Sequence, residues 1–144
     1  MVKKLSSRAL EKPFNYSGNL GVNGRVTTTS LQSNVIFNTS NTLSIVTGAV
    51  TLDLSTTNHF LVSLTSSISS MTFSNPPAAG IFYIFLLKVT ADGTARTITW
   101  PGTVRWANNT PPVLTSTLNK VDTFVFYTED GGSNYYGFIT GQNS

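Results

Sequence analysis

The segment IFYIFLLKVT, residues 81–90, constrains the architecture more than any other part of the sequence. Its first seven residues form the longest apolar run in the chain, and both faces of a strand built from it are apolar until Lys88. Such a strand is buried on both sides, either in the middle of a sheet or beneath a neighbouring subunit. The run therefore supplies four candidates for an oligomer interface, namely Ile81, Tyr83, Phe85 and Leu87.

Turn-forming residues after this segment predict two hairpins. Residues 91–94 (ADGT) supply the first turn, after which residues 96–100 are expected to return as a strand with Ile98 and Trp100 on one face. A short edge strand is expected at residues 104–106. The second hairpin pairs residues 122–128 with 135–140 around the turn EDGGS, residues 129–133.

The first half of the chain is dominated by small polar residues. Between residues 26 and 75, Thr, Ser and Asn account for 27 of 50 positions. Four strands are predicted within this background, at residues 35–38, 43–54 (with a break at Gly48), 59–65 and 68–73. The third has the period-2 alternation of a half-buried strand, and the pair Pro76-Pro77 ends the fourth because proline cannot donate a ladder hydrogen bond.

These patterns predict an all-β fold. No stretch of residues 26–144 keeps the 3.6-residue period of a helix, and about eight short strands recur every 8–12 residues. We expect an antiparallel, jelly-roll-like β-sandwich over residues 35–144, preceded by an extended arm over residues 1–34. No internal repeat is strong enough to argue from.

Composition narrows the classes of function. The 144 residues suit one domain, and the absence of cysteine excludes a disulfide framework and any thiolate site. Only 10% of residues are charged, whereas Thr, Ser and Asn make up 52 of the 144. Hydroxyl-bearing rather than ionic surfaces are poor for acid–base catalysis and suit a structural or binding module.

The net charge of +3 is concentrated at the start of the chain. Residues 1–25 carry five cations and one carboxylate, a net +4, while residues 26–144 carry four cations and five carboxylates, a net −1. Basic arms bind nucleic acid, anionic lipid or an acidic protein surface. The alternative is a solvated terminus. We expect an arm docked on a protein partner through Lys3, Lys4, Arg8, Lys12 and Arg25.

Few residues offer catalytic or metal-binding chemistry. His59 is the single histidine and has no cysteine beside it, so it is expected to be a surface residue rather than a ligand or base. Glu129 and Asp130 are adjacent on a turn, where their side chains diverge, unlike a glycosidase pair. We therefore predict no enzyme activity, no metal and no cofactor. No secretory signal or membrane span is predicted either.

Aromatic residues near loops leave a binding role open. Trp106 with Asn108 and Asn109 offers ring faces and amide groups of the kind that bind sugars. The alternative is that Trp100 and Trp106 cap the end of the sandwich or pack a subunit interface, where aromatic residues are enriched.

A resemblance to a known class of proteins rests on several short motifs. They are TITWP (97–101), VRWA (104–107), TPPVL (110–114), VDTF (121–124), DGG (130–132) and YGF (136–138). With these motifs, the chain resembles small β-domains of tailed-bacteriophage virion proteins from about Val50 to Gln142, with residues 1–40 outside the likeness. The resemblance implies a virion component that is usually non-enzymatic and often trimeric.

Two roles are compatible with that resemblance. In the first, the chain is a capsid decoration (cement) protein whose basic arm binds the major capsid protein or another virion protein. In the second, it is a tail-fibre or tail adaptor module that contacts host polysaccharide. Because 144 residues leave little room for a fibre shaft, we favour decoration. The expected protein is a homo-oligomer, with a trimer favoured, in virions assembled in the host cytoplasm, with no nucleic-acid or membrane partner.

Overall fold

The computed structural model describes residues 38–144, and strands make up most of their regular structure. This confirms the all-β prediction. The predicted strand at 35–38 falls largely outside the described residues, and Asn38 itself is not in a strand. The strands are β1 Asn41–Leu43, β2 Ala49–Asp53, β3 His59–Leu64, β4 Ser70–Ser74, β5 Tyr83–Ala91, β6 Val104–Arg105, β7 Val121–Thr128 and β8 Tyr135–Gly141.

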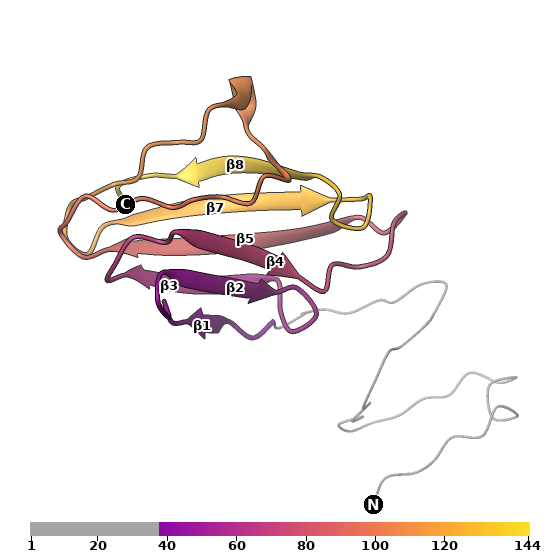
Figure 1. Ribbon diagram of the computed structural model, residues 1–144, viewed down its shortest axis with the longest axis horizontal. Helices are drawn as coiled ribbons and strands as arrows, with labels where there is room; N and C mark the ends of the chain where they lie inside the picture. The colour runs from indigo at the N-terminus through magenta and orange to yellow at the C-terminus, as the bar shows by residue number, and fades with distance from the viewer. Residues whose placement is uncertain (1–37) are drawn as a thin grey trace, which may run out of the picture. The chain divides into compact units, whose positions relative to one another are not determined.

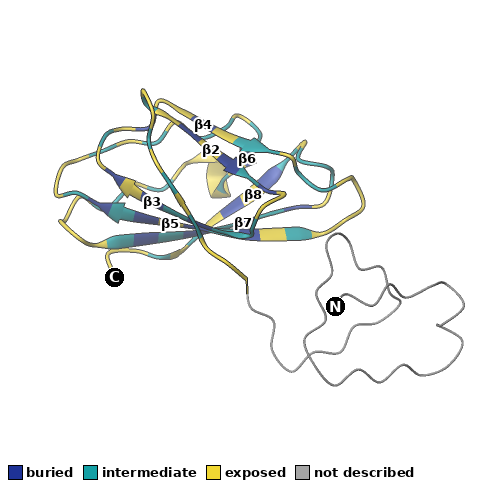
Figure 2. Ribbon diagram, turned by 90° about the horizontal axis from the view of Figure 1, so that it is seen from below, coloured by how far each residue is buried: buried dark blue, intermediate teal, exposed yellow. Residues whose placement is uncertain are grey.

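The strands form two sheets that lie in separate layers (Figures 1 and 2). The larger sheet has the order β1-β3-β5-β7-β8-β6, and the smaller one consists of β2 and β4. In Figure 2 the smaller sheet covers the buried side of the larger one. The apolar strand predicted at residues 81–90 is β5, and it is central in the larger sheet. The prediction that both of its faces are buried is wrong, because only the face with Phe85 and Leu87 is buried and Ile84 on the other face is 47% exposed.

The first half of the chain winds back and forth between the two layers. β1, β3 and β5 are parallel neighbours in the larger sheet, and β2 and β4 are parallel neighbours in the smaller one. We call one strand of the larger sheet together with the next strand or segment in the smaller layer a coil. β1 and β2 thus form the first coil, and β3 and β4 form the second. The coils turn at corners such as Gly48, whose φ of +78° suits glycine and whose Cβ position would lie 2.6 Å from Oγ of Ser69 in the next coil.

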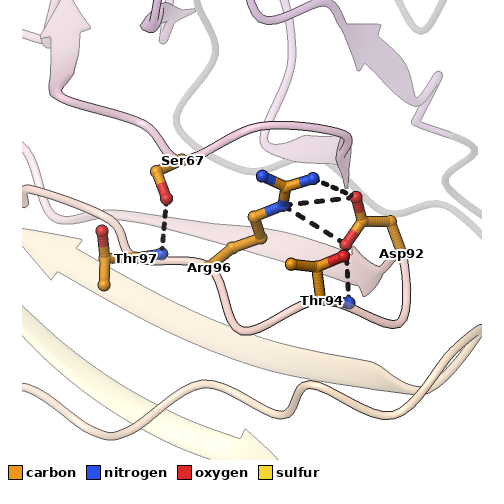
Figure 3. Close-up of polar contacts among 5 residues, drawn as sticks. All are labelled: Ser67, Asp92, Thr94, Arg96 and Thr97. Carbon is orange, nitrogen blue, oxygen red and sulfur yellow. Dashed lines mark hydrogen bonds and ion pairs between the residues drawn. The ribbon is translucent and has the colours of Figure 1, made fainter.

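A third coil continues this arrangement after β5. Ile98 forms a parallel bridge with Ile68 just before β4, through two backbone hydrogen bonds of 2.8 Å. Figure 3 shows the approach to this bridge, where the Thr97 amide donates to Oγ of Ser67 at 3.1 Å. The segment 96–100 therefore lies beside the smaller sheet rather than beside β5.

The predicted strand directions are wrong for this half of the chain. Antiparallel pairing throughout, and with it the jelly-roll arrangement, does not agree with the parallel ladders of β1, β3 and β5 or of β2 and β4. The predicted hairpin at 91–94 is also wrong, since β5 pairs with β7 instead. Alternating side chains look the same in parallel and antiparallel strands, and a coil corner uses the same Asp and Gly residues as a hairpin turn.

The second half agrees better with the sequence. β7 pairs antiparallel with β5 on one side and with β8 on the other, which confirms the predicted hairpin around residues 129–133. β6 is the short edge strand expected at residues 104–106, although it runs parallel to β8.

Aromatic rings from both layers form the centre of the core. Phe73 in β4 packs against Phe85 in β5, Phe126 in β7 and Tyr135 in β8, with ring centroids 5.1, 5.3 and 4.9 Å away. Burying one such side chain contributes about 1.5–3 kcal/mol. The core therefore joins the coiled half to the β7–β8 hairpin.

Candidate functional site

The outer surface of the larger sheet is apolar where three central strands meet. We define the aromatic face as Phe82, Ile84, Tyr127, Tyr136 and Phe138. Ile84 is opposite Tyr127 across the β5–β7 pair, and Tyr127 is opposite Tyr136 across the β7–β8 pair. All of these residues except Tyr127 are classed among the exposed large apolar side chains. Strand alternation places Ile84, Tyr127, Tyr136 and Phe138 outward, because their neighbours on each strand point inward, and Phe82 directly precedes β5.

The rings of the aromatic face stack on one another. The centroid of the Tyr127 ring lies 4.9 Å from that of Tyr136 and 6.1 Å from that of Phe138, with interplanar angles of 19° and 12°. Phe82 lies 5.5 Å away on the other side at 37°. Tyr127 is therefore the centre of a row of rings that crosses the strands.

The interface candidates taken from residues 81–87 need correction. Phe85 and Leu87 are 1% and 0% exposed in the chain's own core, so they are not available to a second subunit. The Tyr83 hydroxyl lies 3.0 and 2.8 Å from the main-chain oxygens of Leu54 and Thr57, so it also bonds within the chain. Only Ile81 remains exposed, at 42%. Phe82 and Ile84, which alternate with these candidates along the chain, lie on the aromatic face. An uninterrupted apolar run does not show which of the two alternating sets of residues faces outward.

Trp106 is mainly a packing residue. Its ring centroid lies 5.1 Å from that of Trp100 and 5.6 Å from that of Phe126, and its indole Nε1 is buried with no hydrogen-bond partner among the described residues. The ring crosses closely over Gly137 of β8, where an added Cβ would lie 2.9 Å from Trp106 Cζ3. Trp106 therefore packs within the chain, against Gly137 of β8 and Phe124 and Phe126 of β7.

Asn108 and Asn109 lie on the exposed turn after Trp106. Both have φ of +55°, a conformation that asparagine tolerates better than most residues. A shallow hollow of about 250 Å³ beside this turn is lined by side chains that include Trp106, Pro112 and Phe138. The structure thus brings two of the proposed sugar contacts to the surface next to a hollow, while glycan binding itself stays a prediction.

The aspartates at the turns are engaged in local hydrogen bonds. Hydrogen bonds from Asn134 hold the pKa of Asp130 below its ordinary value, and a hydrogen bond from Asn75 does the same for Asp53. The pKa of Asp92 is lowered first by Arg96, whose Nη2 donates to its Oδ2 at 2.8 Å (Figure 3). These carboxylates accept hydrogen bonds from main-chain amides within their own turns.

The remaining polar candidates are structural as well. The buried Asp122 accepts hydrogen bonds from the Thr115 amide and hydroxyl at 2.6 and 2.7 Å and from the Asn143 amide at 3.2 Å, so it ties a loop and the C-terminal segment to β7. His59 Nδ1 lies 2.7 Å from Ser40 Oγ at the start of β3. Between residues 38 and 144, no group of three or more His, Asp or Glu side chains is arranged to hold a metal ion.

Other predictions fall outside these observations. The basic residues of the arm, Lys3 to Arg25, lie outside the described residues, as does the boundary at residue 34. Across residues 38–144 there is no helix with the length and hydropathy needed to cross a bilayer.

No protein-family model, curated protein or solved structure matches this chain. The resemblance to phage virion proteins therefore stays a prediction. The feature of the described residues best suited to a function is the aromatic face, an exposed apolar surface.

Proposed function

We propose that this chain is a non-enzymatic structural protein of a bacteriophage virion, with a two-layered β-sandwich as its body. The observation that carries the proposal is the pairing of a rigid aromatic core with an exposed aromatic face, on a body whose aspartates are engaged in turns and loops. Such a body acts through its surfaces, because exposed apolar patches on soluble proteins mark interaction sites. The resemblance in residues 50–142 supplies the virion context.

Within the virion, we propose the role of capsid decoration. The arm carries a net charge of +4 and the rest of the chain −1, so the attraction to an acidic capsid surface is concentrated in residues 1–25. The body then adds mass and apolar contact at the attachment point. Attachment through exposed charges weakens as salt screens them, on a scale of about 8–10 Å at 0.1–0.15 M ionic strength.

The test uses purified phage heads that lack this protein. The arm variant replaces Lys3, Lys4, Arg8, Lys12 and Arg25 with Gln. The control replaces two exposed body cations, Lys88 and Lys120, with Gln.

The arm variant should lose occupancy on heads while its thermal unfolding stays unchanged, and the control should bind as the wild type does. Wild-type occupancy by the arm variant would refute the arm-anchor mechanism. Localisation of the protein to the tail in an electron-microscopy map would refute decoration.

A tail-fibre or adaptor role is the second candidate, and the hollow beside Trp106 favours it. Here Asn108→Gly and Asn109→Gly would remove the amide groups while keeping the positive φ. The matched control is Asn119→Gly, at another exposed position with φ of +62°. Reduced adsorption of particles to host cells for the first pair, but not for the control, would support this role. Equal adsorption by all variants would count against it.

A further inference from the structure

We propose that the aromatic face binds a second copy of this chain. The inference rests on the proposed structural role and deepens it, because it names the partner of the exposed surface of the body. It replaces the buried candidates Phe85 and Leu87 with the outward residues of the same sheet. Three observations carry it: the area of the face, the geometry of its rings and the distribution of charge around it.

The exposed area matches the apolar part of one ordinary interface. Phe82, Ile84, Tyr136 and Phe138 are 61%, 47%, 40% and 49% exposed. With about 150–250 Å² for each large side chain, these four residues present roughly 400 Å² of mostly apolar surface. A stable complex buries about 800 Å² per partner, of which about 56–65% is apolar. One aromatic face on each copy therefore supplies most of the apolar area that such a contact needs.

The orientation of the rings favours a protein partner over a sugar. Sugars bind aromatic side chains through open ring faces, but Tyr127 at the centre of the row has the Phe82, Tyr136 and Phe138 rings as neighbours within the chain. The central ring of the row is therefore less open to a sugar than the outer ones. A second apolar face can pack against the outer rings, as aromatic pairs do in protein cores.

The charge pattern also fits a face that meets its own copy. Among the outward positions of β5, β7 and β8, Lys88 is the single charged residue, and it lies opposite Thr123, away from the ring row. Arg105 on β6 borders the face at its edge, opposite Tyr136. The centre is thus free of charge and the margin is polar, which is the anatomy of a protein interface. A strongly acidic or basic partner would find no complementary charges at this centre.

The test measures the mass of the purified full-length chain by sedimentation velocity between 1 and 100 µM. The disrupting variant combines Ile84→Thr with Phe138→Thr, because threonine keeps β-propensity while shortening the side chain. The matched control combines Val46→Thr with Val113→Thr, two residues that are 65% and 84% exposed and do not belong to the aromatic face.

We expect the wild type and the control to form oligomers over this range. The disrupting variant should shift to monomer, with its dissociation constant raised about 100-fold, since central aromatic contacts dominate interface energetics. The proposal fails if the wild type remains a monomer at 100 µM, which is the result expected if another segment or a foreign partner covers the face. It also fails if both double variants associate equally.

A second measurement does not depend on the stability of the double variant. The chain has no cysteine, so Phe138→Cys and Val113→Cys each introduce one unique thiol. A short bis-maleimide should cross-link the Phe138→Cys protein into dimers and leave the Val113→Cys protein monomeric. Equal cross-linking at both positions would overturn the proposal. Both measurements use purified protein, so they can fail while arm-dependent attachment to heads succeeds, and the reverse.

Discussion

Gly137→Ala should strongly destabilise the protein. Gly137 is buried in β8 between two rings, and an added Cβ would lie 2.9 Å from Trp106 Cζ3 and 3.0 Å from Phe126 Cε1. Carbon atoms prefer about 3.5–4.0 Å, so both rings would have to move by more than half an ångström. Both rings also pack against further rings, including Trp100. Overpacking of this kind costs about 1–3 kcal/mol, and we expect the upper part of that range, about 2–3 kcal/mol.

The assay is thermal unfolding followed by circular dichroism. At roughly 4 °C per kcal/mol for a domain of this size, the melting temperature should fall by about 8–12 °C. The matched control is Gly141→Ala in the same strand, where the nearest atom to the added Cβ is Cβ of Thr123 at 3.7 Å, an ordinary contact. This control should melt within a few degrees of the wild type. Similar melting temperatures for the two variants would refute the close packing of Trp106 on β8.

Three further substitutions test polar contacts. Tyr83→Phe removes a hydroxyl that bonds within the chain, so it should cost about 1 kcal/mol in urea unfolding and leave self-association unchanged. Asp130→Asn removes a carboxylate whose pKa lies below its ordinary value of 3.8 through bonds from Asn134. The ionised Asp130 carboxylate stabilises the fold above pH 3.8, and this stabilisation is lost as the pH falls through the lowered pKa of the folded protein. The melting temperatures of the variant and the wild type should therefore differ more at pH 7 than at pH 3. Asp122→Ala leaves the Thr115 amide without its acceptor and should lower the free energy of unfolding in urea by about 2 kcal/mol.

Most strand positions could be predicted from the sequence, but their partners could not. The alternation of Phe60, Val62 and Leu64 gives β3 within one residue, and Gly48 marks the corner before β2. Side-chain alternation reports which residues point inward, not which strand lies alongside. The turn at Asp92 predicts a hairpin because its residues suit both a hairpin turn and a corner between the two layers. The parallel bridge between Ile98 and Ile68 shows that the chain crosses to the smaller sheet at this turn.

The aromatic face could have been predicted in part. Alternation along residues 124–127 separates Phe124 and Phe126 from Val125 and Tyr127, but which of the two pairs faces the core depends on the second layer. That layer is built from β2 and β4, whose inward residues include Val50, Leu52, Met71 and Phe73, and alternation alone does not show that these residues cover β5 and β7. The interface candidates Phe85 and Leu87 are wrong for the same reason. A run that is apolar at every position does not show which alternating set of side chains faces the core and which faces outward.

The position of β5 determines how the body can come apart. It has a parallel neighbour from the coils on one side and an antiparallel neighbour from the hairpin on the other, and its Phe85 ring stacks 5.2 Å from that of Phe126. Loss of β3 or β7 would expose one edge of β5 and would remove a ring, Phe60 or Phe126, that packs against Phe85. Heating should therefore give a single calorimetric peak for this region, and a protease that cuts the long connection between β5 and β7 should leave the two fragments held together.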